Sequence, residues 1–317
     1  MSQQRTKEST PRVDLGNSIP QNRAAQLSAE ARPPRSTLGV RYILIIVFLF
    51  ADIFIWSVVM RADRAGVLTV AFLDVGQGDA IYIEAPNGNQ VLIDGGPGAK
   101  TLRSLGNVVP FYDRSLDLVI ATHPDQDHIG GLPAVLERMS VLGVMTSENA
   151  TETGAYSAFE KIIQTKNLHR ILARRGEKII LDQGVVLEIL FPDRSTFGWD
   201  TNTGSIVARL TYGDVSFLFT GDSPSSIEHY LAGKDGAHLQ TNVLKLGHHG
   251  SRTSSSREFL SVVDPEYAIV SAGRDNKYGH PNKDVTALLE ELKIPTLSTV
   301  DKGTVIFKTD GTSLRVR

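Results

Sequence analysis

A ten-residue stretch near the middle of the chain constrains its fold and chemistry more than any other feature. It reads Thr122-His-Pro-Asp-Gln-Asp-His-Ile-Gly-Gly131 and directly follows the apolar run Leu116–Ala121. A short apolar run of this kind predicts a buried strand. The polar residues then stand on the loop at the carboxyl end of that strand, where alternating side chains can converge on one point.

The residue types in this loop predict a metal site. His123, Asp125, Asp127 and His128 offer imidazole nitrogens and carboxylate oxygens, the donors that divalent cations take in proteins. Four such donors within six positions disfavour an ordinary solvated loop. A calcium loop of the EF-hand type fails, because Leu136 stands where its bidentate Glu belongs. Further ligands must come from distant sequence, and the candidates are Asp222 and the pair His248-His249.

The motif order along the chain resembles a known family. His-x-Asp-x-Asp-His followed by Gly-Gly is similar to the signature of the metallo-β-lactamase superfamily, with Asp125 where most members carry a second histidine. Together with three further segments, this pattern resembles the extracytoplasmic hydrolase domain of the ComEC family of competence proteins. They are Phe72-Leu-Asp-Val-Gly-Gln-Gly-Asp79, Leu218-Phe-Thr-Gly-Asp222 and Leu244-Lys-Leu-Gly-His-His-Gly-Ser251. The resemblance covers residues 67–317.

The expected fold is an αββα sandwich of two mixed sheets with helices outside, preceded by a single transmembrane helix. Strand-like and helix-like segments alternate, and each motif falls where a strand meets a loop. Ser223 as N-cap and Pro224 at the first helical position predict a short helix that runs to about Leu231.

The expected centre holds two divalent metal ions. Asp125 in place of a histidine favours manganese over zinc, because oxygen donors suit the harder ion. The resemblance gives Asp222 the role of bridging both ions and gives Asp94 that of fixing a ligating histidine, with Asp79 near the site. The predicted ligands are His123, Asp125, Asp127, His128, Asp222 and His248.

The remaining candidates concern catalysis and substrate. Adjacent histidines after a strand point in different directions, so we favour His248 as ligand and assign His249 to catalysis. Asp127 is the candidate base. Asn202 stands about where most of the superfamily has a metal-binding histidine, so it binds substrate or leaves one ion an open position.

The predicted substrate-binding residues are Ser251, Thr253, Ser254 and His280. The serine and threonine cluster from Ser251 to Ser256 starts a helix whose free N–H groups suit an anion such as phosphate. His280 lies in a segment that resembles one of the ComEC family.

The N-terminal part predicts a membrane anchor. Residues 1–37 lack apolar periodicity and predict a disordered cytoplasmic tail, whereas residues 42–60 are nearly all apolar, so 38–62 is the expected anchor and 67–317 the hydrolase domain. A cleaved signal peptide is disfavoured by the length of the run. Basic residues concentrate before it, which places the tail inside and the domain outside the cytoplasmic membrane. Asp52 within the run is either a tolerated protonated carboxyl or a contact with a membrane partner.

Composition limits the partners. The chain has no cysteine, which excludes disulfides and thiolate ligands. Residues 65–317 carry 24 Lys and Arg against 30 Asp and Glu, a net of −6, so the domain lacks the basic footprint of a tight nonspecific DNA binder. We expect a hydrolase of phosphodiesters, most simply DNA, and a DNA-uptake channel as a possible partner. The rivals are a lactone or β-lactam hydrolase and a noncatalytic metal-stabilised module.

Overall fold

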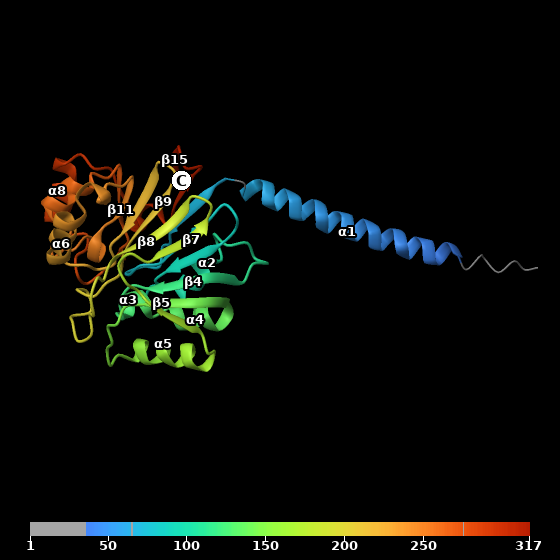
Figure 1. Ribbon diagram of the computed structural model, residues 1–317, viewed down its shortest axis with the longest axis horizontal. Coiled ribbons are helices and arrows are strands. Elements are labelled where there is room, and N and C mark those ends of the chain that lie inside the picture. Colours follow the sequence, from blue (N-terminus) through green and yellow to red (C-terminus); the bar gives the residue numbers. More distant parts are fainter. Residues whose placement is uncertain (1–35, 65, 275) are drawn as a thin grey trace, which may run out of the picture. The chain divides into compact units, whose positions relative to one another are not determined.

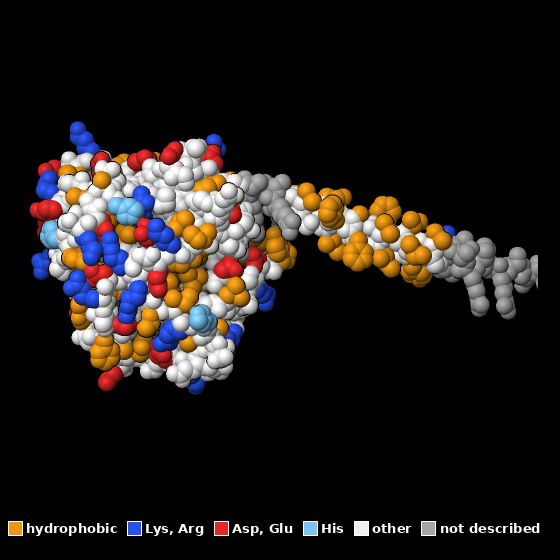
Figure 2. Space-filling model, viewed as in Figure 1, with side chains coloured by type: hydrophobic (Ala, Val, Ile, Leu, Met, Phe, Trp, Pro, Cys, Tyr) orange, Lys and Arg blue, Asp and Glu red, His pale blue; other side chains and the backbone are white. Residues whose placement is uncertain are grey.

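The computed structural model describes residues 36–64, 66–274 and 276–317, so most of the predicted tail lies outside the described residues. The chain divides into two compact units, residues 1–59 and 60–317. The first described element is helix α1 (Ser36–Arg64). Its stretch Gly39–Val59 has a mean hydropathy of 2.6 and none of it is buried. Figure 2 shows apolar side chains along the visible face of this helix. By length and composition, this helix is able to cross a membrane.

The larger unit is built on two mixed β-sheets (Figure 1). The first has eight strands in the order β15-β14-β1-β2-β3-β4-β5-β6. Their bounds are β1 (Leu68–Phe72), β2 (Ile81–Glu84), β3 (Gln90–Ile93), β4 (Ser115–Ala121), β5 (Ser140–Thr146), β6 (His169–Leu172), β14 (Val305–Thr309) and β15 (Leu314–Val316). Strands β3 to β6 pair in parallel, and the other neighbours pair antiparallel.

The second sheet has seven strands in the order β13-β12-β11-β10-β9-β8-β7. Their bounds are β7 (Lys178–Asp182), β8 (Val185–Phe191), β9 (Val207–Tyr212), β10 (Val215–Phe219), β11 (Val243–Lys245), β12 (Tyr267–Val270) and β13 (Thr296–Ser298). Strands β10 to β13 are parallel, whereas β7, β8, β9 and β10 pair antiparallel.

Helices cover the outer faces of both sheets. Their bounds are α2 (Lys100–Leu105), α3 (Gln126–Ile129), α4 (Leu132–Arg138), α5 (Gly154–Thr165), α6 (Ser225–Asp235), α7 (Arg257–Val263), α8 (Lys283–Glu291) and α9 (Thr299–Lys302), with 3₁₀ turns η1 (Gly236–Leu239) and η2 (Gly247–Gly250). Helices α2, α4 and α5 share a buried apolar cluster with the first sheet, and α6, α7 and α8 share one with the second.

A third apolar cluster fills the space between the sheets. Phe72 of the first sheet lies 6.2 Å from Phe219 of the second, ring centre to ring centre, and Phe307 lies 5.9 Å from Phe217. Such aromatic contacts add to the burial that holds two sheets face to face. The predicted αββα sandwich is confirmed, with helices outside and an apolar layer on each face of each sheet.

The start of helix α6 differs from the prediction. Pro224 is the N-cap and Ser225 the first helical residue, because Ser223 N–H still donates to Thr220 O (3.1 Å) in the turn that follows β10. The helix also continues to Asp235, beyond Leu231. Its last turn is largely polar, so apolar periodicity could not reveal it.

Candidate metal centre

The metal-motif loop begins where β4 ends. Thr122 donates from its backbone N–H (2.8 Å) and its hydroxyl (2.7 Å) to the Asp94 carboxylate, which follows the neighbouring strand β3. His128, the second histidine of this loop after His123, contacts the same carboxylate, with 2.7 Å between His128 Nδ1 and Asp94 Oδ2. All three side chains are buried. Asp94 thus fixes the ring of His128 so that Nε2 faces the site, the role that the resemblance implied.

His123 and His128 lie side by side, with ring centres 4.1 Å apart, and both are buried. Burial and the neighbouring His128 lower the pKa of His123 to about 3, so its ring is neutral at physiological pH. Burial also opposes the charged form of His128, but the carboxylates Asp222 and Asp94 outweigh it and raise the pKa of His128 well above its usual range.

Asp222 stands at the centre of the site. It follows β10 through Gly221, which has a positive φ of 52°. One oxygen lies 3.2 Å from His128 Nε2, and the other lies 3.8 Å from His123 Nε2 and 3.5 Å from His249 Nε2. Burial would raise the pKa of Asp222, but His128 and His249 lower it well below its usual range. This carboxylate therefore joins ligands from both sheets.

The two adjacent histidines of turn η2 have different surroundings. Both have left-handed backbones, with φ of 47° for His248 and 57° for His249. His249 is fully buried, and its Nε2 lies 3.2 Å from Asp127 Oδ2. His248 is partly exposed, with Nε2 3.7 Å from Asp222 and Nδ1 3.3 Å from Thr253 Oγ1. The sequence favoured His248 as ligand, whereas these contacts favour His249.

A buried lysine supports His249. Lys245 Nζ lies 2.7 Å from one oxygen of Asp79, and the other oxygen of Asp79 lies 3.3 Å from His249 Nδ1. Lys245 and Asp79 are both almost fully buried. Burial opposes ionisation, but Lys245 and His249 lower the pKa of Asp79 to about 2, so it is an anion that holds the ring of His249 in place. Sequence reasoning missed Lys245, although a lysine in the otherwise apolar strand β11 was a usable signal.

The residues fit a bound cation. One ligand atom each from Asp79, His128, Asp222 and His249 lies within 4.8 Å of the others. His123 Nε2, His128 Nε2 and Asp222 Oδ1 are buried and make no hydrogen bond. Buried polar atoms are normally satisfied, and converging unsatisfied nitrogen and oxygen donors are what a divalent ion would satisfy.

The predicted carboxylates Asp125 and Asp127 lie at the rim. The side chain of Asp125 is 37% exposed, with Oδ2 3.7 Å from His123 Nε2, and that of Asp127 is 29% exposed. Asn202 lies three residues before Ser205, whose hydroxyl accepts the N–H of Asp222 (3.2 Å). The side-chain oxygen of Asn202 is buried without a hydrogen-bond partner.

The expected anion site at the Ser251–Ser256 segment needs correction. Glu228, a buried carboxylate on α6, accepts the backbone N–H groups of Ser255 (2.6 Å) and Ser256 (2.8 Å). These N–H groups are therefore not free for a substrate phosphate, because the protein supplies its own anion.

The predicted substrate-binding hydroxyls of this segment are already engaged in hydrogen bonds within the protein. Ser254 Oγ donates to Ser223 O (2.8 Å), and Ser251 Oγ lies 3.0 Å from Thr253 Oγ1. His280, the fourth predicted contact, does approach the site. Its ring centre lies 5.4 Å from that of His248.

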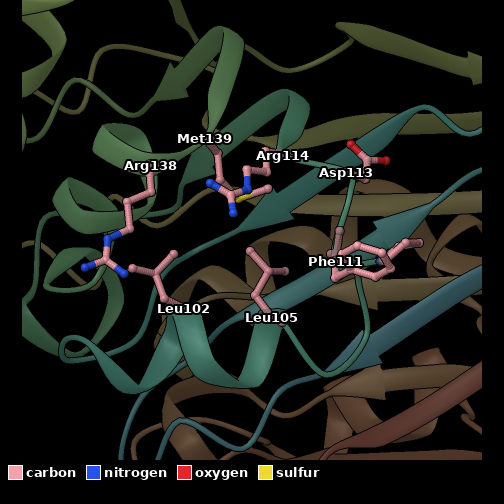
Figure 3. Close-up of a pocket in the computed structure, with 10 residues that line it drawn as sticks. Leu102, Leu105, Phe111, Asp113, Arg114, Arg138 and Met139 are labelled. Carbon is pink, nitrogen blue, oxygen red and sulfur yellow. The ribbon is translucent and has the colours of Figure 1, made fainter.

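Among the described residues, a small cavity of about 20 Å³ touches the cluster through His123, and the domain also holds two larger cavities. One of about 520 Å³ lies between α2 and the end of α4 and is lined by residues such as Leu105, Phe111 and Arg138 (Figure 3). Another of about 510 Å³ reaches the site only through its wall residues Arg274, His280 and Pro281. Among the described residues of the site, Asp125 and Asp127 form a partly exposed polar rim over buried histidines and carboxylates.

The fold and this set of donors define a metal-dependent hydrolase of the metallo-β-lactamase type, and the chain belongs to the metallo-β-lactamase superfamily, whose family model matches residues 73–274. More closely, it is similar to competence proteins. It is 31% identical over 263 residues to ComE operon protein 3 of Bacillus subtilis and 33% identical over 242 residues to competence protein ComA of Neisseria gonorrhoeae. Each match covers 75% of this chain, and the chain spans about a third of each relative (33% and 32%).

Solved structures share the fold at low sequence identity. Igni18, a metallo hydrolase from Ignicoccus hospitalis, matches with a TM-score of 0.51 and 18% identity over 76% of this chain and 98% of its own. CmlA, a diiron β-hydroxylase from Streptomyces venezuelae, matches with a TM-score of 0.52 and 15% identity over 76% of this chain and 54% of its own. At these identities the likeness establishes the fold alone.

Proposed function

We propose that this protein is a membrane-anchored, metal-dependent phosphodiesterase that acts on DNA outside the cytoplasmic membrane. The observation that carries the proposal is Asp222, a buried carboxylate with Nε2 atoms of His123, His128 and His249 within 3.8 Å. A carboxylate so placed suits a centre that holds two divalent ions. DNA as the substrate is supported by the competence proteins among the relatives.

Each side chain has a definite task in this proposal. The ligands are His123, Asp125, Asp127, His128, Asp222 and His249, with His249 in the place that the sequence gave to His248. Bound divalent ions would supply Lewis acidity, lowering the pKa of a water and stabilising charge on the phosphoryl oxygens. Asp125 adds an oxygen donor, which favours manganese over zinc.

The proton and the substrate are handled at the exposed rim. Asp127 is partly exposed and lies beside His249, so its free oxygen is placed to take a proton from an attacking water. His248 and His280, whose rings lie 5.4 Å apart on the solvent side, are placed to contact the substrate or protonate the leaving oxygen. Asn202 offers a buried, unsatisfied side-chain oxygen nearby.

The proposed location rests on the N-terminal part. Helix α1 holds an apolar stretch of 21 residues, and the sequence places Arg23, Arg32 and Arg35 before it and Arg41 near its start, but only Arg61 and Arg64 shortly after it. The positive-inside rule then puts the N-terminus in the cytoplasm and the hydrolase domain outside. A channel that takes up DNA is the partner that fits this arrangement.

Replacing Asp222 tests the proposal. We expect Asp222→Ala in the full-length chain to lose bound manganese and all measurable hydrolysis of a small phosphodiester and of DNA. The matched control is Asp214→Ala, at the exposed hairpin that joins β9 and β10. If Asp222→Ala keeps both metal and activity, the proposed centre is wrong.

A further inference from the structure

The hydrolase domain has a net negative charge, so contacts other than long-range electrostatic attraction must hold a polyanionic substrate. Residues 65–317 carry a net charge of −6, so long-range attraction does not favour a nucleic acid. Proteins that bind single strands combine charge with aromatic side chains on which bases stack. Two exposed aromatic rings, Tyr278 and Phe197, lie on loops that also contribute residues to the metal centre, and rings of this kind can supply the second kind of affinity.

The first ring belongs to Tyr278, which is 58% exposed. It stacks on His280 with ring centres 5.6 Å apart and an angle of 21° between the rings. His280 in turn lies 5.4 Å from His248, ring centre to ring centre, at the metal centre. Tyr278 and His280 therefore form a pair of nearly parallel rings that extends from His248 to the protein surface.

Hydrogen bonds of Asn276 link two parts of the loop that carries these rings. The Asn276 side chain donates to Gly273 O (2.8 Å) and to His280 O (2.6 Å), and its oxygen accepts the N–H of His280 (2.8 Å). Lys277 Nζ lies 5.0 Å from the centre of the Tyr278 ring. Lys277 therefore covers part of the ring, and a base that stacks on Tyr278 takes the place of this flexible side chain, whose charge stays near the phosphate of that base.

The second ring is Phe197, which is 78% exposed on the loop between β8 and β9. Glu148 braces this loop by accepting the Ser195 hydroxyl and the N–H of Thr196 (3.3 Å). Four residues after Phe197, the Thr201 side chain bonds to Asp125 at the rim of the site. Four residues of chain reach at most about 14 Å, which is the largest distance that can separate the Cα atoms of Phe197 and Thr201.

We propose that Tyr278 and Phe197 stack on unpaired bases of a single-stranded polynucleotide while its backbone crosses the metal centre. This inference rests on the proposed function and narrows its substrate to strands whose bases are free to stack. Bases in a duplex are paired and stacked on one another, so these rings would discriminate against it.

Binding tests the inference separately from cleavage. The full-length chain in detergent, with chelator present, is titrated into fluorescent single strands of about 12 nucleotides, with thymine bases or abasic throughout, and into a duplex of that length. We expect the base-containing strand to bind about tenfold more tightly than the abasic strand and the duplex. Tyr278→Ala and Phe197→Ala should each remove most of that difference, and Tyr278→Trp should restore it.

Phe111→Ala is the matched control. Phe111 is 89% exposed but lines the cavity beside α2, where no proposed ligand lies (Figure 3). The inference is overturned if wild type binds abasic and base-containing strands equally, if both variants keep the difference, or if Phe111→Ala removes it too. The proposed function fails separately if wild type, loaded with manganese, cleaves neither DNA nor a small phosphodiester.

Discussion

At the residue scale, the contacts separate two histidines that the sequence could not. His249 is fully buried between Asp79 and Asp222, whereas His248 is partly exposed and its ring contacts the hydroxyl of Thr253. A ligating histidine usually gives its second ring nitrogen to a carboxylate. Asp79 meets that requirement for His249, and Lys245 holds Asp79 in place.

This difference gives the first prediction. We expect His249→Ala to weaken metal binding by more than about 100-fold, because loss of a ligand exceeds the 10- to 100-fold typical of losing its hydrogen-bonded partner. His248→Ala should keep metal and lose turnover instead. Metal content after dialysis at fixed free manganese measures both. Retention of metal by His249→Ala together with its loss from His248→Ala would restore the assignment made from the sequence.

At the scale of elements, the junctions between strands and loops position the site. In the turn after β1, the backbone packs directly against the backbone of the metal-motif loop. Gly78 has a φ of +122°, and a Cβ built there would lie 2.0 Å from the backbone oxygen of Asp127. Asp79 N–H donates to that same oxygen (3.2 Å). Close packing of backbone on backbone therefore fixes the distance between Asp79 and the metal-motif loop.

Gly78→Ala should consequently damage the site, because backbone atoms cannot move aside as a flexible side chain would. Gly76→Ala is the control, since Gly76 also has a positive φ (85°) but a Cβ there meets nothing within 4 Å. Both variants should lose about 1 kcal/mol of stability to backbone strain. Only Gly78→Ala should also lose metal affinity. Equal metal affinity in the two variants would show that this close approach is unimportant.

Glu228 links helix α6 to the segment before α7, because its carboxylate accepts the backbone N–H groups of Ser255 and Ser256. Burial raises the pKa of this carboxyl, although the N–H groups of Ser255 and Ser256 counteract it. A raised pKa means that the folded state binds the proton more tightly, so this contribution to stability is complete below the unfolded pKa and is lost as pH rises through the folded pKa.

Replacing Glu228 by Gln tests this contribution. We expect a loss of about 1–2 kcal/mol, because the new amide nitrogen faces a backbone N–H. The difference in free energy of unfolding between wild type and variant should narrow as pH rises from just below the ordinary glutamate pKa. Only the wild type loses the stability that comes from binding a proton at Glu228. Thermal unfolding in chelator across that range measures this difference. A difference that widens with pH would contradict the raised pKa.

At the scale of the whole molecule, a single apolar helix precedes a hydrolase domain, which leads to a topological prediction. Protease added to spheroplasts should digest residues 67–317 and spare the N-terminal tail, because the basic residues before the span retain it in the cytoplasm. Immunoblotting of tags at the two ends reads this out. A protected domain, or a mature chain that starts after Met60, would contradict the proposed orientation.

Sequence patterns predicted the sandwich and named most of the side chains that the structure brings together at the proposed centre, because those signals are local. The four donors of the motif, from His123 to His128, lie within five positions of one another, and Asp222 follows an apolar strand. Lys245 and Glu228 escaped prediction because their partners lie on distant elements. For Glu228 those partners are backbone N–H groups, which leave no trace in residue type. The packing of distant elements decides such contacts, across the two sheets for Lys245 and between α6 and the segment before α7 for Glu228.

The most direct test of the central claim is hydrolysis by the metal-depleted full-length chain after reconstitution. Manganese should restore cleavage of DNA and of a small phosphodiester, and zinc should restore less, because Asp125 supplies oxygen where a histidine would favour zinc. The panel includes a lactone and a β-lactam. If the manganese-loaded protein opens those rings but leaves every phosphodiester intact, or if no ion restores any activity, the account of this protein as a phosphodiesterase is wrong.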